Sequence, residues 1–171
     1  MSVILPAVTT LLVSPAAIAS VAIGLFSGVI AAIVMDWPMS RQPEGFTPAY
    51  IAAGIVTRQP QTNVSFPVAM AVHHIAAGLG GVLYAVLVAL FSFVVPPATA
   101  VGVNLLAHLL AVTVVVGFIY GFFAHFVLPH RGGRSYEEQA TAIRGQWLRS
   151  ALVFGATLFV TVPLVTVTLI S

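Results

Sequence analysis

Four long apolar stretches limit what this sequence can fold into. They cover residues 15–35, 66–94, 99–128 and 147–170, and each holds at least ~20 mostly apolar residues, enough for an α-helix to cross a ~30 Å hydrocarbon core. Only 6% of the 171 residues are charged, and the mean hydropathy is +1.09. Because a soluble domain carries roughly 25% charged residues, this chain cannot cover a water-facing surface. We expect an all-α, polytopic membrane protein, folded as a single domain with a bundle of four transmembrane helices.

The connections between the apolar stretches differ in length and in proline content. The first connection, residues 36–64, is long, and within it Thr47-Pro48 is typical of a helix start. The apolar residues 49–56 that follow predict a short helix at the membrane interface. Pro96-Pro97 predicts a tight turn, so that the second and third spans form an antiparallel hairpin.

The positive charges lie on one side of the predicted bundle. All of them are arginines, in or next to the first and third connections: Arg41, Arg58, Arg131, Arg134, Arg144 and Arg149. With four spans these two connections face the same side, and the positive-inside rule places that side in the cytoplasm. The sequence therefore predicts a multi-pass protein of the cell membrane with both termini outside.

The composition and the motifs exclude several classes of function. Without cysteine there is no disulfide, thiolate metal site or catalytic thiol. Six arginines without interleaved aromatic residues do not make a surface that binds nucleic acid. The glycine run at residues 78–81 follows no predicted strand, and there is no phosphate loop or HExxH motif. These absences favour a non-enzymatic protein.

A group of ionisable residues is predicted near the cytoplasmic ends of the first three spans. On this topology Asp36, His73, His74 and His125 lie at similar depth. Ionisable groups at membrane depth are costly and are usually functional or paired. Because neighbouring helix residues point ~100° apart, we expect only one of His73 and His74 to join the group fully.

Small residues indicate which helix faces approach one another. Five glycines share faces with the ionisable group: Gly28, Gly78, Gly81, Gly117 and Gly121. We expect the glycines of the second and third spans to bring these two helices close together. His74 is favoured over His73 because it shares its face with Gly78 and Gly81, and Asp36, His74 and His125 are predicted to converge.

The chemistry of this group leaves several hypotheses open. Three imidazoles and a carboxylate could bind a divalent metal ion. A b-type haem needs two facing histidines, which His74 and His125 would provide. The group could instead handle protons or ions, or its members could simply form hydrogen bonds that lock three helices together.

A second polar layer is predicted nearer the outer side. Tyr84 lies about one turn from the outer end of its span, and Asn104 and His108 lie four residues apart at matching depth. Such a layer predicts an interhelical hydrogen bond, worth about 0.6 kcal/mol on average in a membrane. A path that joined the two layers would cross roughly 15 Å of glycine and aliphatic residues.

Three segments carry a resemblance: GLFSGVIAAIVMD, HHIAAGLGGVLYAVL and GFIYGFFAHFVLP, one in each of the first three spans. They resemble small four-helix prokaryotic membrane proteins of unknown function, which implies the fold and no activity. We expect a non-enzymatic membrane component that forms oligomers or joins other membrane subunits within the lipid bilayer. The alternatives are a metal- or haem-binding redox protein and a small proton or ion conductor.

Overall fold

The computed structural model describes residues 14–100 and 102–170, and this part of the chain is almost entirely helical. The helices are α2 (Pro15–Ser40), α3 (Thr47–Thr57), η1 (Gln61–Asn63), α4 (Phe66–Val94), α5 (Leu105–Phe122), η2 (Phe123–Val127), α6 (Leu128–Arg131) and α7 (Gly133–Ile170). A two-stranded antiparallel hairpin, β1 (Thr99–Ala100) and β2 (Val103–Asn104), precedes α5. The predicted all-helical architecture is confirmed.

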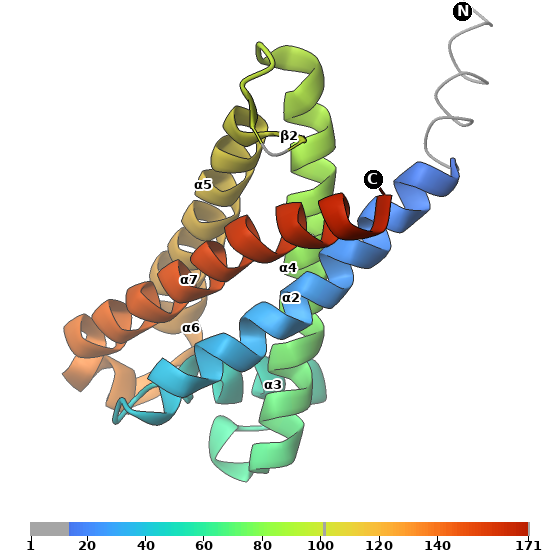
Figure 1. Cartoon of the computed structure of the whole chain (residues 1–171). Coiled ribbons are helices and arrows are strands. Elements are labelled where there is room, and N and C mark those ends of the chain that lie inside the picture. The colour runs from blue at the N-terminus through green and yellow to red at the C-terminus, as the bar shows by residue number, and fades with distance from the viewer. Residues whose placement is uncertain (1–13, 101, 171) are drawn as a thin grey trace, which may run out of the picture.

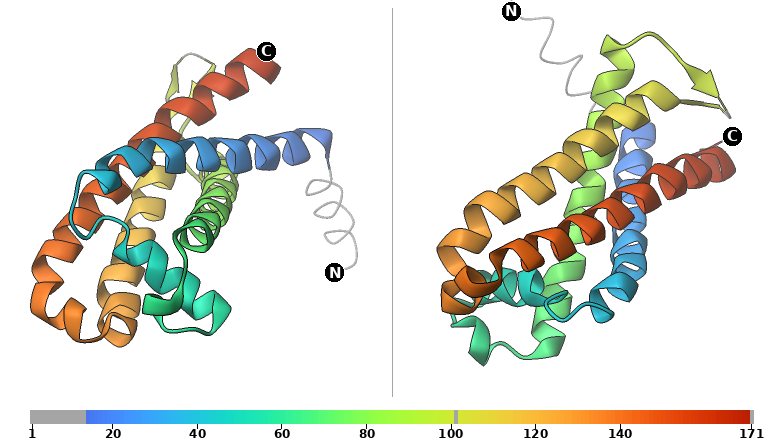
Figure 2. Two further views of the ribbon diagram at one scale, coloured as in Figure 1. Left: turned by 90° about the horizontal axis from the view of Figure 1, so that it is seen from below. Right: turned by 90° about the vertical axis from the view of Figure 1, so that its left-hand side faces the viewer.

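Four of the described helices are long and apolar enough to cross a membrane. They are Pro15–Ser40, Phe66–Val94, the continuous run Leu105–Arg131, and Tyr136–Leu169. Each of the four main helices has two neighbours, since α2 and α5 both pack against α4 and α7. The short helices α3 and α6 lie together at one end of the bundle, with the end of α2 and the start of α7 (Figures 1 and 2).

The first long helix extends further than predicted. It continues past residue 35 to Ser40 and includes Pro38, which removes one backbone donor close to the helix end. The backbone N–H of Arg41 closes the last turn by donating to the carbonyl groups of Pro38 and Met39. Asp36 therefore lies on a rigid helix, about one turn before its end.

The third and fourth long helices do not begin where their predicted apolar stretches begin. Instead of a tight turn at Pro96-Pro97, the chain forms the β1–β2 hairpin, in which Gly102 adopts a positive φ of 80°. The third helix thus begins at Leu105 rather than at residue 99. The fourth begins at Gly133, ahead of its apolar stretch 147–170 and close to Tyr136, where the capping-box sequence of residues 135–138 predicts a helix start. Gln139, with φ −123° and ψ 17°, interrupts this helix after its first turns.

Backbone contact between α2 and α4 holds the centre of the bundle. A Cβ atom on Gly81 would collide with the carbonyl oxygen of Gly24, and one on Gly28 would collide with that of Ala77. Because neither helix has a side chain there, their backbones can approach closely. The predicted glycine packing is therefore present, but it joins the first and second long helices.

The glycines of α5 lie elsewhere, which corrects the prediction that they pack against α4. A Cβ atom on Gly117 or on Gly121 would meet no atom within 4 Å. The contact between α5 and α7 involves larger side chains, where Val112 and Val116 of α5 pack over Gly155 of α7. Gly117 and Gly121 therefore remain uncovered within the chain.

Candidate functional site

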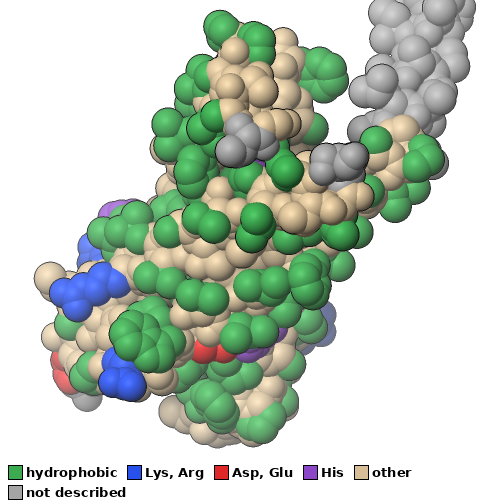
Figure 3. Space-filling model, in the orientation of Figure 1, with side chains coloured by type: hydrophobic (Ala, Val, Ile, Leu, Met, Phe, Trp, Pro, Cys, Tyr) green, Lys and Arg blue, Asp and Glu red, His purple; other side chains and the backbone are tan. Residues whose placement is uncertain are grey.

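Asp36 of α2 lies between two adjacent histidines of α4. Its Oδ2 atom is 3.1 Å from Nε2 of His74, and its Oδ1 atom is 3.3 Å from Nε2 of His73. His73 is 7% exposed, whereas Asp36 and His74 are about one quarter exposed, at 25% and 26%. Figure 3 shows an acidic side chain beside a histidine at the lower end of the molecule. The group lies where the end of α2 crosses the beginning of α4.

The hydrogen bonds of His74 define where protons can be. Its Nδ1 atom lies 2.8 Å from the carbonyl oxygen of Met70, which can only accept, so Nδ1 carries a proton and donates it. A neutral imidazole then has a bare Nε2, which would face the carboxylate of Asp36 as a second acceptor. The contact is attractive only if one further proton lies on His74 or on Asp36. The contact therefore brings together a carboxylate and an imidazole that can share a proton.

The structure changes the predicted role of His73. We expected only one of the two adjacent histidines to reach the group, and His74 was favoured. Both reach it, because the two oxygens of one carboxylate each face a different ring, and the rings lie 5.2 Å apart in an edge-to-face arrangement. His73 is the more deeply buried of the two.

The structure does not bring His125 to this group, which corrects the predicted convergence. His125 is exposed, and its ring lies edge-to-face with that of Tyr120, 6.0 Å away. It belongs to the π-helix η2, residues 123–127. A π-helical turn contains an extra residue, so every side chain beyond its start is rotated from the face that a regular α-helix would give. The sequence pattern assumed a regular helix.

The predicted metal and haem sites do not fit these positions. Among the described residues, no group of three or more His, Cys, Asp or Glu side chains is arranged to hold a metal ion. A haem ligated by His74 and His125 would need the two rings to face each other across the iron, and His125 is exposed on the outside of the bundle.

The outer polar layer consists of one buried hydrogen bond. The hydroxyl of Tyr84 on α4 lies 2.8 Å from Nδ1 of His108 on α5, and both side chains are buried. Asn104 has another role, since its side-chain oxygen accepts from the backbone N–H groups of Ala107 and Ala98. It caps α5 and holds the preceding loop, while Tyr84 and His108 link two helices.

No polar path joins the two layers along the α2–α4 contact. Here the backbones touch at Gly24, Gly28 and Gly81, so there is no room for a chain of water molecules between these helices. Ser27 is fully buried nearby, and its hydroxyl has no hydrogen-bond partner. The proton-conductor hypothesis gains no support from this contact.

Comparison with known proteins identifies no relative. Neither the family models, nor the curated proteins, nor the solved structures give a match to this chain. The function must therefore be argued from the geometry of the molecule itself.

The sequence did not reveal an apolar cavity that reaches His73. It has a volume of about 320 Å³ and lies between α4 and α5, with α2, α3 and α7 behind them. Small residues of α4, such as Ala76 and Gly80, leave the space, and aromatic residues such as Phe118 and Phe154 surround it. Alanine and glycine are common in apolar helices, so no spacing in the sequence distinguishes these positions from ordinary packing sites.

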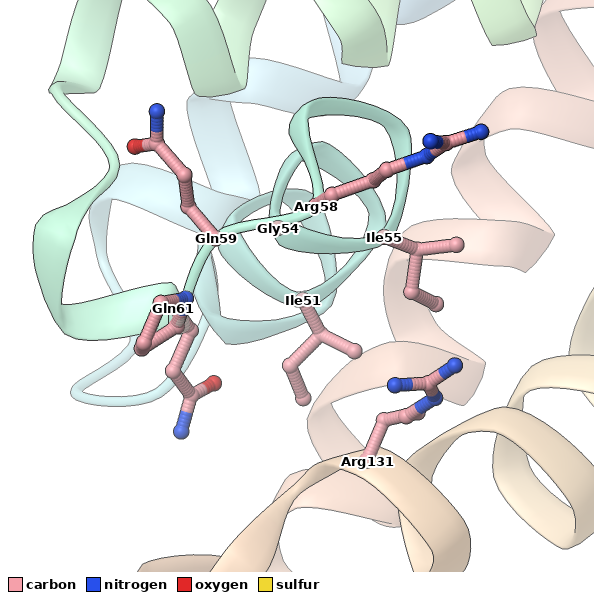
Figure 4. Close-up of a pocket in the computed structure, with 8 residues that line it drawn as sticks. Ile51, Gly54, Ile55, Arg58, Gln59, Gln61 and Arg131 are labelled. Atoms are coloured by element: carbon pink, nitrogen blue, oxygen red, sulfur yellow. The ribbon is translucent and has the colours of Figure 1, made fainter.

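A basic hollow of about 410 Å³ lies at the same end of the molecule, between the end of α3 and α6 (Figure 4). Arg58 and Arg131 line it together with Ile51 and Gln61. Arg58 is also the left-handed residue that ends α3, with φ 57°. Among the described side chains neither arginine forms an ion pair, so the positive charge at this end is not neutralised.

Proposed function

We propose that this chain is a non-enzymatic integral membrane protein that forms oligomers through α5. The four long helices cross the bilayer, and the end that carries the arginines faces the cytoplasm. The short helix α3 lies at the interface there, and both termini lie outside. The lengths of the four spans, 26 to 34 residues, and the many exposed large apolar side chains support this placement.

The observation that carries the assembly role is the uncovered glycine face of α5. Gly117 and Gly121 lie one turn apart, and neither has an atom within 4 Å of an added Cβ. The exposed rings of Phe118 and Phe122, stacked 5.6 Å apart, flank this face. Two small residues four positions apart let membrane helices approach closely, and large neighbours then pack around the contact.

A second copy of this chain fits this face better than lipid does. Lipid chains gain little from a flat glycine surface, whereas the same surface on a partner helix can meet it backbone to backbone. Such a contact is self-complementary, as the interface of a two-fold symmetric dimer requires.

The test is the mass of the purified protein in detergent, measured by light scattering. We expect the wild type to be dimeric, and Gly117→Leu and Gly121→Leu to be monomeric with unchanged helix content, because a Cβ atom at either position meets no atom of its own chain within 4 Å. Val114→Leu is the matched control, since it enlarges another exposed position of α5 and should leave the dimer intact. A monomeric wild type, or Leu variants that remain dimeric, would contradict the proposal. Co-purification of a different small membrane protein in place of a second copy would contradict self-association.

A further inference from the structure

The basic hollow between α3 and α6 has a shape that is set by contacts between helices. Ile51, which is 1% exposed and lies in the lining, packs in one cluster with Leu128 of α6 and Tyr136 of α7. The side-chain amide of Gln61 donates to the main-chain oxygen of Gly132 at 3.3 Å, which ties η1 to the turn before α7. The two walls of the hollow are therefore held in place by the fold itself.

Two arginines from different helices give the hollow its positive charge. Arg58 comes from the end of α3 and Arg131 from α6, and Figure 4 shows both side chains extending to the right in this view, with Ile55 between them. Both arginines are exposed, and neither forms an ion pair with a side chain that the structure describes. None of the described residues in the lining is acidic. An anion in the hollow would therefore meet guanidinium groups whose N–H donors have no carboxylate partner.

The end of α3 opposes an anion only weakly. The C-terminal end of a helix carries roughly half of a negative elementary charge. Part of it is already compensated, because the backbone N–H of Arg58 donates to the carbonyl groups of Gly54 and Ile55, and that of Gln59 donates to Gly54. Two full positive charges on the arginines exceed the remaining partial charge. The hollow as a whole therefore favours a negatively charged ligand.

The apolar part of the lining distinguishes a lipid from a free anion. Ile55 is 41% exposed, and the exposed ring of Pro60 lies in the same lining. Inorganic phosphate gains nothing from these side chains, whereas the glycerol and acyl parts of a lipid can pack on them. The volume of about 410 Å³ is within the range for ligand pockets and suits a small head group. On the membrane placement proposed above, this end of the bundle lies at the cytoplasmic interface, where basic residues attract anionic lipids.

We propose that the basic hollow binds the phosphate-bearing head group of an anionic phospholipid of the cytoplasmic leaflet. Arg58 and Arg131 hold the anionic head, and Ile55 contacts the glycerol and the adjoining part of the acyl chains. The proposal rests on the membrane placement given under the proposed function, and it does not require the dimer.

Mass spectrometry of the intact protein in detergent tests the proposal, because it counts the lipids that remain bound to each chain. We expect phosphatidylglycerol to bind saturably, and at least about fivefold more tightly than phosphatidylcholine, whose phosphate is balanced by a positive charge. Arg58→Gln and Arg131→Gln should each weaken binding of phosphatidylglycerol at least about fivefold, which corresponds to about 1 kcal/mol. Both side chains are exposed, so the helix content of these variants should not change.

A matched variant and a second probe separate the hollow from general charge attraction. Arg149→Gln removes the same charge from an exposed position of α7 outside the lining, and it should leave lipid binding unchanged. Inorganic phosphate should show no saturable binding over the concentration range in which the lipid saturates. Ile55→Ser should weaken binding of phosphatidylglycerol without removing the preference over phosphatidylcholine, because it alters only the apolar contact.

Three outcomes would overturn the proposal. One is equal binding of the two lipids, and another is an equal effect of Arg149→Gln and the two lining variants. The third is binding of inorganic phosphate as tight as that of the lipid, which would show a site for free anions. A monomeric protein can still bind the lipid and a dimer can fail to bind it, so this test is independent of the assembly proposal.

Discussion

At the scale of single residues, the arrangement around Asp36 is defined by which atoms can donate. Met70 offers a carbonyl oxygen to Nδ1 of His74, and Asp36 offers a carboxylate to Nε2. Both neighbours of this ring are acceptors, so the contact is attractive when one more proton lies on His74 or Asp36 than in a separate neutral imidazole and carboxylate. The pair is then neutral overall, which is the cheapest way to place a carboxylate among apolar helices.

This argument predicts a specific change in the protonation of His74. In ¹⁵N NMR of labelled protein, the Asp36→Asn substitution should shift the Nε2 resonance of His74 and leave its Nδ1 resonance protonated, because only the partner of Nε2 is altered. His130 is a matched control, since its Nδ1 atom also contacts a main-chain oxygen, that of Phe126 at 2.6 Å, and no carboxylate contact accompanies it. An unprotonated Nδ1 on His74 in the wild type would contradict the argument.

At the scale of helices, glycines at similar spacing have opposite surroundings. In the α2–α4 contact a Cβ atom on Gly81 would collide with the backbone of α2, whereas on α5 a Cβ atom on Gly117 or Gly121 would enter open space. The spacing of glycines therefore shows that a helix face consists of small residues, but it does not show which helix covers that face. Whether such a face forms a close contact depends on which helix lies opposite it.

The two kinds of glycine should respond to alanine in opposite ways. Gly81→Ala should lower the free energy of unfolding by about 1–3 kcal/mol, because α2 and α4 must separate to admit the methyl group. In the monomeric Gly121→Leu protein, Gly117→Ala should raise it by roughly 0.5–1 kcal/mol, because alanine favours the helix and meets no neighbour within the chain. Denaturant titrations in detergent measure both. A loss of stability of similar size in both variants would show that another part of the same chain covers Gly117.

The sequence predicted the helices well and their mutual contacts less well. The second span agrees with its prediction at both ends, residues 66–94, because proline and apolar composition define them locally. His125 was misplaced because the sequence pattern does not show the π-helical turn that rotates it. The α5 glycines were misplaced because helical spacing does not show which neighbouring helix packs against them. Asp36 and His74 were correctly paired, since both lie near helix ends at the same depth. The contact of His73 with Asp36 was not expected alongside that of His74, because the prediction did not consider that the two oxygens of one carboxylate can each face a different ring.

At the scale of the whole molecule, the charge is strongly asymmetric. The basic hollow, α3 and the start of α7 lie at one end, and the hairpin before α5 lies at the other (Figure 1). Figure 3 shows the arginine side chains of this face in its lower part only. Such a distribution fixes the orientation of short multi-pass proteins during insertion.

Cysteine labelling can test this orientation, because the chain has no cysteine of its own. A membrane-impermeant maleimide added to intact cells should label an Ala98→Cys protein, because the proposed orientation places the exposed loop before α5 outside the cell. A Gln59→Cys protein, altered at the exposed end of α3, should react only after the cells are opened. The reverse pattern would place both termini in the cytoplasm, and the arginine argument would then fail.

The backbone contact between α2 and α4 also determines which parts of the bundle can move. Side chains can change rotamer and absorb a displacement, but two touching backbones cannot, so α2 and α4 form one stiff frame. The apolar cavity lies between this frame and α5. A wider cavity would therefore require α5 to move away from this frame, and the π-helical turn at residues 123–127 is where its regular α-helical hydrogen bonding is interrupted. In this bundle the α2–α4 pair is the fixed part, and α5 is the helix that can move relative to it.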